Sequence, residues 1–268
     1  AAARARLADE LAALDADFAF VAACNAGGEA MAPADVARLQ QIAERRWLRT
    51  LDDRLGVSPE ELRRIGDICL RRDILVVADE IHCELVMPGF RYTPFASLCE
   101  EFERRSVTCT SPSKAFNLAG LQVANISAAD AALRARIGHS LQINETGEIG
   151  PFAIEALIAA YDEGAEWLDA LNEYLHGNYR FSREYFDRNL PQYPVLPLEG
   201  TYLVWVDCRA SGLTSDELET KLLEEAKLRI NPGAIYGEAG RDFIRLNIAC
   251  PRKLLAEGLD RLRKVLKR

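Results

Sequence analysis

The sequence predicts an α/β protein in which a large domain with a mostly parallel sheet precedes a small C-terminal α+β domain. Three observations support this fold class. A well-capped amphipathic helix leads directly into a short apolar strand, a second strand leads into a turn of small and polar residues, and the chain after Val195 changes to short strands with single helices. We assign residues 58–160 to the large-domain part and residues 161–268 to a linking helix and the small domain. Residues 1–57 form an unmatched N-terminal segment.

The helix that opens the large-domain part has clear boundary signals. In SPEELRRIGDICLRRD, Ser58 is a suitable N-cap, Pro59 suits the first helical position, and Glu61 completes a capping box. The run ILVVADE that follows has the length and the β-branched content of a strand. A continuous apolar run of this kind is typical of a strand buried on both faces of a parallel sheet. Helix followed by buried strand is the α/β pattern.

The second half of the chain predicts two long helices and then a small α+β unit. Residues 151–190 are enough for two helices, of which the second is suited to bridge the domains, and we place the boundary near Tyr161. EGTYLVWVDC, LRINPG and DFIRLNIAC are strand-like, SDELETKLLEEAK is an amphipathic helix, and another helix closes the chain. Tyr202 and Trp205 are predicted to be core residues of their strand.

The composition favours a small-molecule partner. The chain has 268 residues, 49% of them hydrophobic, and a formal net charge of -8. An acidic chain lacks the basic surface that nucleic-acid binding needs, so we expect no nucleic-acid partner. The three histidines and seven scattered cysteines show no metal-ligand spacing, and we expect reduced thiols. We recognise no signal peptide and no apolar run of membrane length, and therefore expect a cytoplasmic protein without a membrane partner.

Two strand ends carry the candidate chemistry. Asp79 stands at the end of the apolar strand, and the segment SPSK, which ends at Lys114, follows the next strand. Taken singly, Asp79 is explained as a loop hydrogen-bonder and Lys114 as a surface charge. Together they converge on one crevice, because open α/β sheets bind ligands at the carboxyl ends of their strands. A turn with hydroxyl and N–H groups suits a phosphate, and a lysine and an aspartate beside it are what pyridoxal phosphate requires.

Four segments in order carry a family resemblance. VVADEIHCELVMPGFRYTPFASL, SPSKAFNLAGLQ, EGTYLVWVDCR and FIRLNIACP together resemble the pyridoxal-phosphate-dependent enzymes of fold type I, in particular the cystathionine β-lyase branch of the class I/II aminotransferase-like family. The resemblance extends from Ser58 to the C-terminus. It implies a PLP-dependent transferase-like large domain, partly missing, plus the small C-terminal α+β domain. It also implies an amino-acid substrate and, if the fold is complete enough, a homodimer.

The resemblance also implies roles for single residues. Lys114 is the expected catalytic residue, which forms the Schiff base with the cofactor. Asp79 is the expected partner of the pyridinium nitrogen, and Ser111 and Ser113 are expected to bind the phosphate. His82 stands where many relatives carry a tyrosine that contacts the phenolic oxygen of the cofactor, but it is equally explained as a core histidine bonded to a backbone carbonyl.

Arg245 is implied to bind the α-carboxylate of the substrate. A planar guanidinium suits this task because it can hold a carboxylate through two parallel hydrogen bonds. An ion pair with Asp242 or a surface position is the alternative for this arginine.

Three functions remain open from the sequence. The first is a C–S β-lyase that acts on cystathionine or a related cysteine conjugate and releases pyruvate, ammonia and a thiol. The second is an aminotransferase of amino acids, which shares every step up to the carbanion, so the preference for a lyase rests on the resemblance. The third is a non-catalytic or degenerate module, because the chain is too short for the family's whole N-terminal portion. A sheet that lacks those strands is expected to have exposed edges.

Overall fold

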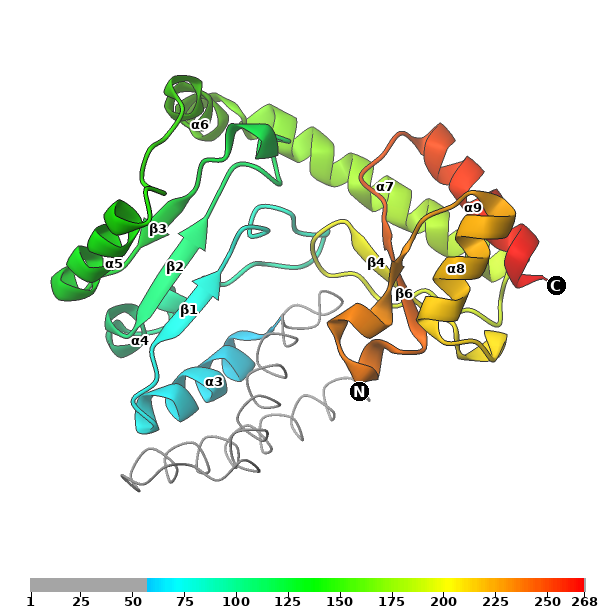
Figure 1. Cartoon of the computed structure of the whole chain (residues 1–268), viewed down its shortest axis with the longest axis horizontal. Helices are drawn as coiled ribbons and strands as arrows, with labels where there is room; N and C mark the ends of the chain where they lie inside the picture. Colours follow the sequence, from blue (N-terminus) through cyan, green and yellow to red (C-terminus); the bar gives the residue numbers. More distant parts are fainter. Residues whose placement is uncertain (1–56, 268) are drawn as a thin grey trace.

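Helix α3 (Pro59–Arg71) opens the part of the chain that this computed structural model describes, residues 57–267 (Figure 1). Its start confirms the predicted capping box. The Glu61 N–H donates to Ser58 Oγ (3.2 Å), and the Ser58 N–H donates to Glu61 Oε2 (2.8 Å). These bonds satisfy donors that the helix itself leaves without partners. Residues 1–56 of the N-terminal segment lie outside the described residues.

Three strands form the sheet of the large-domain part, in the order β1-β2-β3. They are β1 (Val76–Asp79), β2 (Ser106–Thr110) and β3 (Asn125–Ser127). Strand β1 is parallel to β2, and β3 is antiparallel to it. Helix α4 (Glu100–Arg104) packs on α3, where a Cβ on Gly66 would lie 2.3 Å from the ring of Phe102. Only glycine therefore allows this close approach of the two helices.

Strand β1 differs from the expected strand buried on both faces. Val77 is 64% exposed, and Leu75, just before the strand, is 39% exposed. The reason is the position of β1, which within residues 57–267 pairs with β2 alone and is the edge of this sheet. The expectation of an exposed sheet edge is thus met in the described part of the chain.

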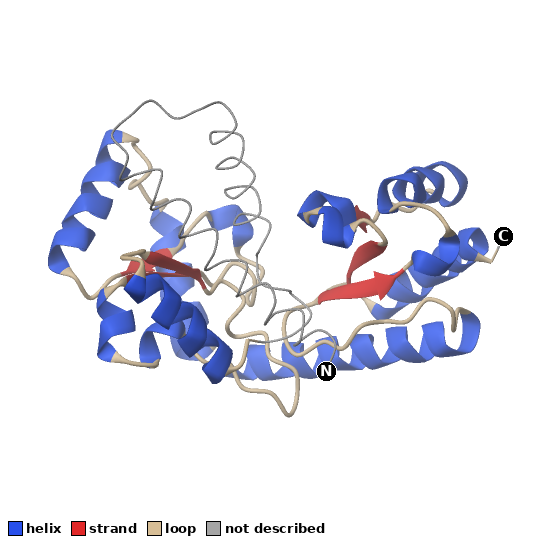
Figure 2. Ribbon diagram, turned by 90° about the horizontal axis from the view of Figure 1, so that it is seen from below, coloured by secondary structure: helices blue, strands red, loops and turns tan. Residues whose placement is uncertain are grey.

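Three helices connect the two parts of the chain. They are α5 (Ala131–Ile143), α6 (Pro151–Glu163) and α7 (Ala165–Asn189). The two helices expected in residues 151–190 are present as α6 and α7, which meet at Gly164. Helix α7 runs from α6 to the small domain (Figure 1), and Figure 2 shows the two sheets apart from each other with α7 alongside. Among the described helices, none has a stretch of the length and apolarity that a bilayer crossing requires.

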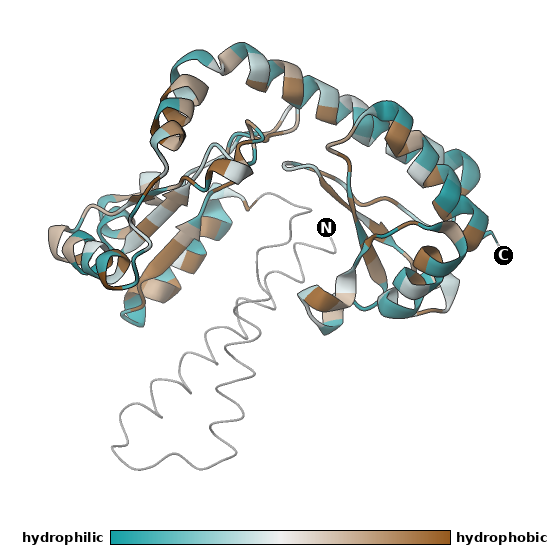
Figure 3. Cartoon of the chain, turned by 45° about the horizontal axis from the view of Figure 1, so that its top comes forward, coloured by the Kyte–Doolittle hydropathy of each residue, from teal (hydrophilic) through white to brown (hydrophobic). Residues whose placement is uncertain are grey.

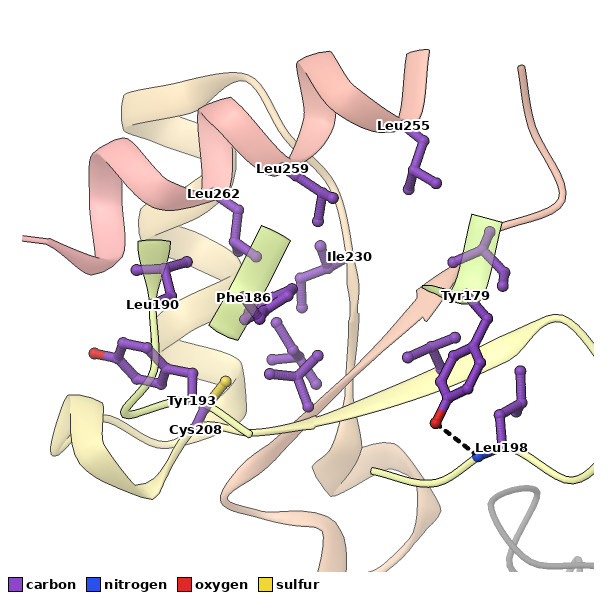
Figure 4. Packing of buried hydrophobic residues seen from close by; sticks show 14 of the residues in the cluster. Tyr179, Phe186, Leu190, Tyr193, Leu198, Cys208, Ile230, Leu255, Leu259 and Leu262 are labelled. Carbon is purple, nitrogen blue, oxygen red and sulfur yellow. Dashed lines mark hydrogen bonds between the residues drawn. The ribbon is translucent and has the colours of Figure 1, made fainter. Parts of the chain in front are cut away.

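The small domain contains an antiparallel sheet in the order β4-β6-β5. Its elements are β4 (Leu203–Asp207), α8 (Ser215–Ala226), β5 (Asn231–Pro232), β6 (Phe243–Asn247) and α9 (Arg252–Leu266). Hydrophobic residues follow the strands of both sheets (Figure 3). In Figure 4, Phe186 of α7 and Leu190, the residue after α7, pack with Leu259 and Leu262 of α9. Full burial of each such side chain stabilises the fold by about 1.5–3 kcal/mol relative to exposure.

A short antiparallel contact joins the large-domain part to the small domain. The Met87 N–H donates to the Glu199 carbonyl (2.9 Å), and the Thr201 N–H donates to the Leu85 carbonyl (2.7 Å). Gly200 lies between them, where a Cβ would lie 3.0 Å from the Leu85 carbonyl oxygen. The chain that follows β1 is therefore fixed to the chain that enters β4.

Candidate active site

The carboxyl ends of β1 and β2 lie side by side because the two strands are parallel. Asp79 is the last residue of β1 and is in register with Cys109 of β2. Its side chain is exposed, and Oδ1 accepts a hydrogen bond from the Ile81 N–H (3.3 Å). The structure thus places the predicted carboxylate at the strand end, one strand away from the segment that carries Lys114.

The turn after β2 is held by the hydroxyl of Ser111. This side chain is 3% exposed, donates to the Val123 carbonyl (2.6 Å), and accepts from the Ser113 N–H (3.1 Å). The two serine hydroxyl oxygens lie 2.9 Å apart. The backbone then turns, since the Leu118 N–H donates to the Ser113 carbonyl (3.1 Å). Lys114, which is half-buried, therefore projects from a backbone that is fixed on both sides.

Helices α6 and α7 support the turn that carries Lys114. The sequence does not predict this support. Trp167 of α7 donates its indole N–H to the carbonyl of Ala115, the residue next to Lys114 (3.1 Å). Ala115 is fully buried. Tyr161 of α6 meets the ring of Phe116 edge to face, with ring centroids 6.2 Å apart. The only hint in the sequence was the apolar content of these helices, which does not specify a partner.

His82 lies where the large-domain part meets the small domain. Its ring contacts that of Tyr202 edge to face, with centroids 5.6 Å apart and an interplanar angle of 74°. Of the two predicted core residues, Trp205 is 7% exposed and confirms the prediction. Tyr202 directly precedes β4 and is half-buried against the core, so the prediction holds for it only in part. Burial raises the pKa of Tyr202, and the positive charge of Arg245 lowers it. Tyr202 therefore contacts His82, the predicted cofactor contact, and is near enough to Arg245, the predicted carboxylate-binding residue, to be affected by its charge.

Arg245 lies in the middle of β6, in register with Trp205 of β4 and Asn231 of β5. Its Cζ is 4.2 Å from the ring centroid of Tyr236, which is a stacking distance. The Tyr236 ring in turn meets Trp205 edge to face, with centroids 5.4 Å apart. The sequence predicts Arg245 as a site residue, but it does not predict the contacts of Arg245 with Tyr236 and of Tyr236 with Trp205.

A group of acidic and weakly acidic side chains follows β1. Glu80 is 8% exposed and accepts a hydrogen bond from the Phe95 N–H (3.0 Å). Burial and then the charge of Glu80 raise the pKa of Tyr92. Burial and then the charge of Glu84 raise the pKa of the Cys83 thiol to about 12. The raised pKa values keep the Tyr92 hydroxyl and the Cys83 thiol protonated at neutral pH. Within residues 57–267, no cluster of three or more potential ligands suits a metal ion.

The comparison with known families decides the identity of the fold. Residues 56–262 match the model of the family described as aminotransferase class I and II. The chain belongs to this family.

Several relatives of this aminotransferase class I and II chain are named as C–S lyases. The chain is 40% identical over 209 residues to cystathionine beta-lyase PatB of Bacillus subtilis (strain 168). This match covers 78% of this chain and 54% of PatB. It is 35% identical over 207 residues to protein MalY of Escherichia coli (strain K12), with 75% and 51% covered. These matches confirm the resemblance to the cystathionine β-lyase branch. The chain spans about half the length of the curated relatives it matches.

Solved structures of the family have the same architecture. Cystalysin from Treponema denticola, whose crystal structure contains a pyridoxal 5'-phosphate cofactor, has a TM-score of 0.76 and 34% identity over 78% of this chain and 53% of its own. The C–S lyase from Staphylococcus hominis, solved with pyridoxal phosphate bound, has a TM-score of 0.72 and 30% identity over 79% of this chain and 54% of its own. The described residues therefore form part of the fold type I architecture, as expected.

Proposed function

We propose that the protein binds pyridoxal phosphate and acts as a C–S β-lyase on cystathionine or a related cysteine conjugate. One observation carries the proposal: Lys114 projects from a hydrogen-bonded turn at the end of β2, and Asp79 ends the neighbouring parallel strand. This donor set fits the cofactor, because it combines an amine for the aldehyde, a carboxylate for the ring nitrogen and hydroxyl groups for the phosphate. The similarity to proteins named as lyases supports the reaction type.

The serines divide their tasks in this proposal. The Ser111 hydroxyl is buried and already bonded to the Val123 carbonyl and the Ser113 N–H, so it orients the turn. The half-buried Ser113 hydroxyl, 2.9 Å from it, meets the phosphate. Asp79 pairs with the ring nitrogen, and His82 contacts the phenolic oxygen. Ser111 thus contributes to phosphate binding mainly through the position it gives to Ser113.

The chain's own side chains move the proton and hold the substrate. When bound, pyridoxal phosphate supplies an electron sink for the carbanion that remains after a bound amino acid loses its α-proton. Arg245 holds the α-carboxylate, and the Lys114 amine removes the α-proton. The C–S bond then breaks, and its electron pair leaves with the sulfur, which is protonated to a thiol. Addition of water gives pyruvate and ammonia, so all atoms of the conjugate are accounted for.

The deciding experiment maps the lysine that reacts with the cofactor. The purified chain is mixed with pyridoxal phosphate, reduced with borohydride and analysed by mass spectrometry of its peptides. We expect one major reduced adduct, on Lys114, and its loss together with all turnover in Lys114→Ala. Lys253→Ala, which removes an exposed lysine of α9, is the matched control and should leave the adduct unchanged.

Two outcomes would contradict the role of Lys114, and a third would contradict the reaction type. Adducts spread over surface lysines would remove Lys114 from its role, as would full turnover in Lys114→Ala. If the adduct forms but amino-group transfer exceeds pyruvate release, the cofactor site stands and the aminotransferase alternative replaces the lyase.

A further inference from the structure

The Arg245 guanidinium lies over an aromatic ring that comes from a different element. The Arg245 Cζ lies 4.2 Å from the centroid of Tyr236, in the 3-10 turn formed by Gly233–Tyr236. A guanidinium at this distance from a ring is held by cation–π attraction and keeps several N–H donors for a carboxylate. The ring therefore restrains the side chain that has to receive the carboxylate.

The turn that carries Tyr236 is fixed by close backbone contacts. A Cβ on Gly240 would lie 2.1 Å from the Gly233 carbonyl oxygen, so the two ends of this loop touch through glycines. The Ala234 N–H donates to the hydroxyl of Ser215 (3.0 Å), whose own N–H donates to the Arg241 carbonyl (2.7 Å). Ser215 is 1% exposed. The position of the ring is thus set by the small domain itself.

Trp205 supports the ring from the side. Its indole meets Tyr236 at an interplanar angle of 72° and is 7% exposed. Trp205 and Arg245 are cross-strand partners on β4 and β6, so the sheet holds the arginine and the supporting indole in register. Tyr236 therefore lies in contact with both cross-strand partners and is restrained by each.

We propose that Tyr236 is a positioning residue, which orients the Arg245 guanidinium for the α-carboxylate of the substrate. This inference rests on the proposed function and adds a specificity element to the same site. Arginine has a long side chain with several rotatable bonds, and ordering it on binding costs conformational entropy. A stacked guanidinium has already lost most of that freedom before the ligand arrives, so the carboxylate binds more tightly.

The test compares two ligands that differ only in the carboxylate. L-alanine has no β-leaving group and therefore binds without elimination, and ethylamine is the same molecule without the carboxylate. Dissociation constants are measured from the absorption change of the cofactor-loaded chain. In Tyr236→Leu we expect an approximately tenfold weaker affinity for L-alanine and an affinity for ethylamine within about twofold of the parent. Tyr236→Phe keeps the ring and should stay within about threefold of the parent for both ligands.

A second variant removes the arginine itself. In an Arg245→Ala background, Tyr236→Leu should cause no further loss of L-alanine affinity, because the group that it orients is gone. Equal losses for both ligands in Tyr236→Leu, or a Tyr236→Phe variant as weak as Tyr236→Leu, would overturn the inference. Either result would mean that the ring serves general packing.

A cofactor-free measurement separates this inference from the proposed function. If the chain forms no adduct at Lys114, propionate is titrated against the Trp47→Phe, Trp167→Phe double variant, whose remaining tryptophan is Trp205. We expect propionate to change the Trp205 fluorescence, with roughly tenfold weaker binding after Tyr236→Leu. Absence of propionate binding, or equal binding with and without Tyr236, would overturn the inference without reference to the cofactor.

Discussion

At the scale of single residues, the site contains a cysteine whose environment suppresses its reactivity. Cys83 follows His82 directly, and burial and then the charge of Glu84 raise the pKa of its thiol from 9.0 to about 12. The thiolate is the reactive form of cysteine, so a raised pKa lowers the reaction rate at neutral pH. A raised pKa also means that the native state favours the protonated thiol. This stabilising contribution is present below pH 9 and is lost as the pH rises towards 12.

We expect Cys83 to resist alkylation in the folded protein. At pH 8 its thiolate fraction is about a thousandfold below that of an unperturbed cysteine, because its pKa is about three units higher. Peptide mass spectrometry after iodoacetamide treatment measures the rate at this residue. The same peptide from urea-unfolded protein is the control, and equal rates in the two states would contradict the prediction.

The sequence predicts which residues form the candidate site better than it predicts the side chains that contact them. Asp79, Lys114 and Arg245 could be found because each stands at a strand end or in a segment with a family resemblance. Tyr236 could not, because its contact with Arg245 depends on how a turn folds over the sheet. A single sequence contains no signal for such a contact between elements.

At the scale of elements, helix α7 is fastened to the segment that follows β6. The fully buried Asn178 donates through Nδ2 to the carbonyls of Ile248 (2.7 Å) and Cys250 (3.0 Å). Its Oδ1 accepts from the Nε of Arg252 (2.6 Å). One amide side chain thus bonds to two carbonyls of the segment between β6 and α9 and to the Arg252 guanidinium, which connects the long helix to the strand of Arg245.

Asn178→Ala should destabilise the protein strongly. The substitution leaves the buried Ile248 carbonyl, the partly buried Cys250 carbonyl and a guanidinium N–H without their partner. The expected cost is about 2–4 kcal/mol in the free energy of unfolding. Urea denaturation measures the change. Asn189→Ala is the matched control on the same helix, because Asn189 makes one bond to the Tyr185 carbonyl of its own helix (2.9 Å). Similar losses in the two variants would contradict the role of Asn178.

Elements with local signals were predicted well, and those that depend on neighbours were not. The start of α3 follows from Ser58 and Glu61, and the α6–α7 division lies at Gly164, in the stretch expected to hold two helices. The exposure of Val77 was not predicted. An apolar run indicates that a segment forms a strand, but it does not show how many strands lie beside that strand in the sheet.

At the scale of the whole molecule, the buried core is unequally divided. The main cluster of buried hydrophobic side chains lies in the small domain and α7, and Leu85, Met87 and Ala115 are its fully buried members from residues 58–160. Within residues 57–267, strand β1 is the edge of its sheet, whereas β6 lies between β4 and β5. Local stability follows burial and protected hydrogen bonds, so it should differ between the two sheets.

Hydrogen exchange should show this difference directly. We expect peptides from β4 and β6, where Val204, Val206 and Ile244 are fully buried, to exchange at least tenfold more slowly than peptides from β1. Mass spectrometry of deuterated peptides gives both rates in one experiment. Comparable protection of β1 and β6 would show that the large-domain part is as stable as the small domain.

The pairing of Leu85–Met87 with Glu199–Thr201 should also restrict any rotation of the two parts relative to each other, because its hydrogen bonds join them directly. It forms a second connection besides α7, and it lies only a few residues from His82 and Tyr202. A rotation of the small domain about this connection displaces nearby side chains least and distant ones most. His82 and Tyr202 lie next to this connection, so we expect their ring contact, and with it the position of Tyr202 near Arg245, to persist when the two parts rotate.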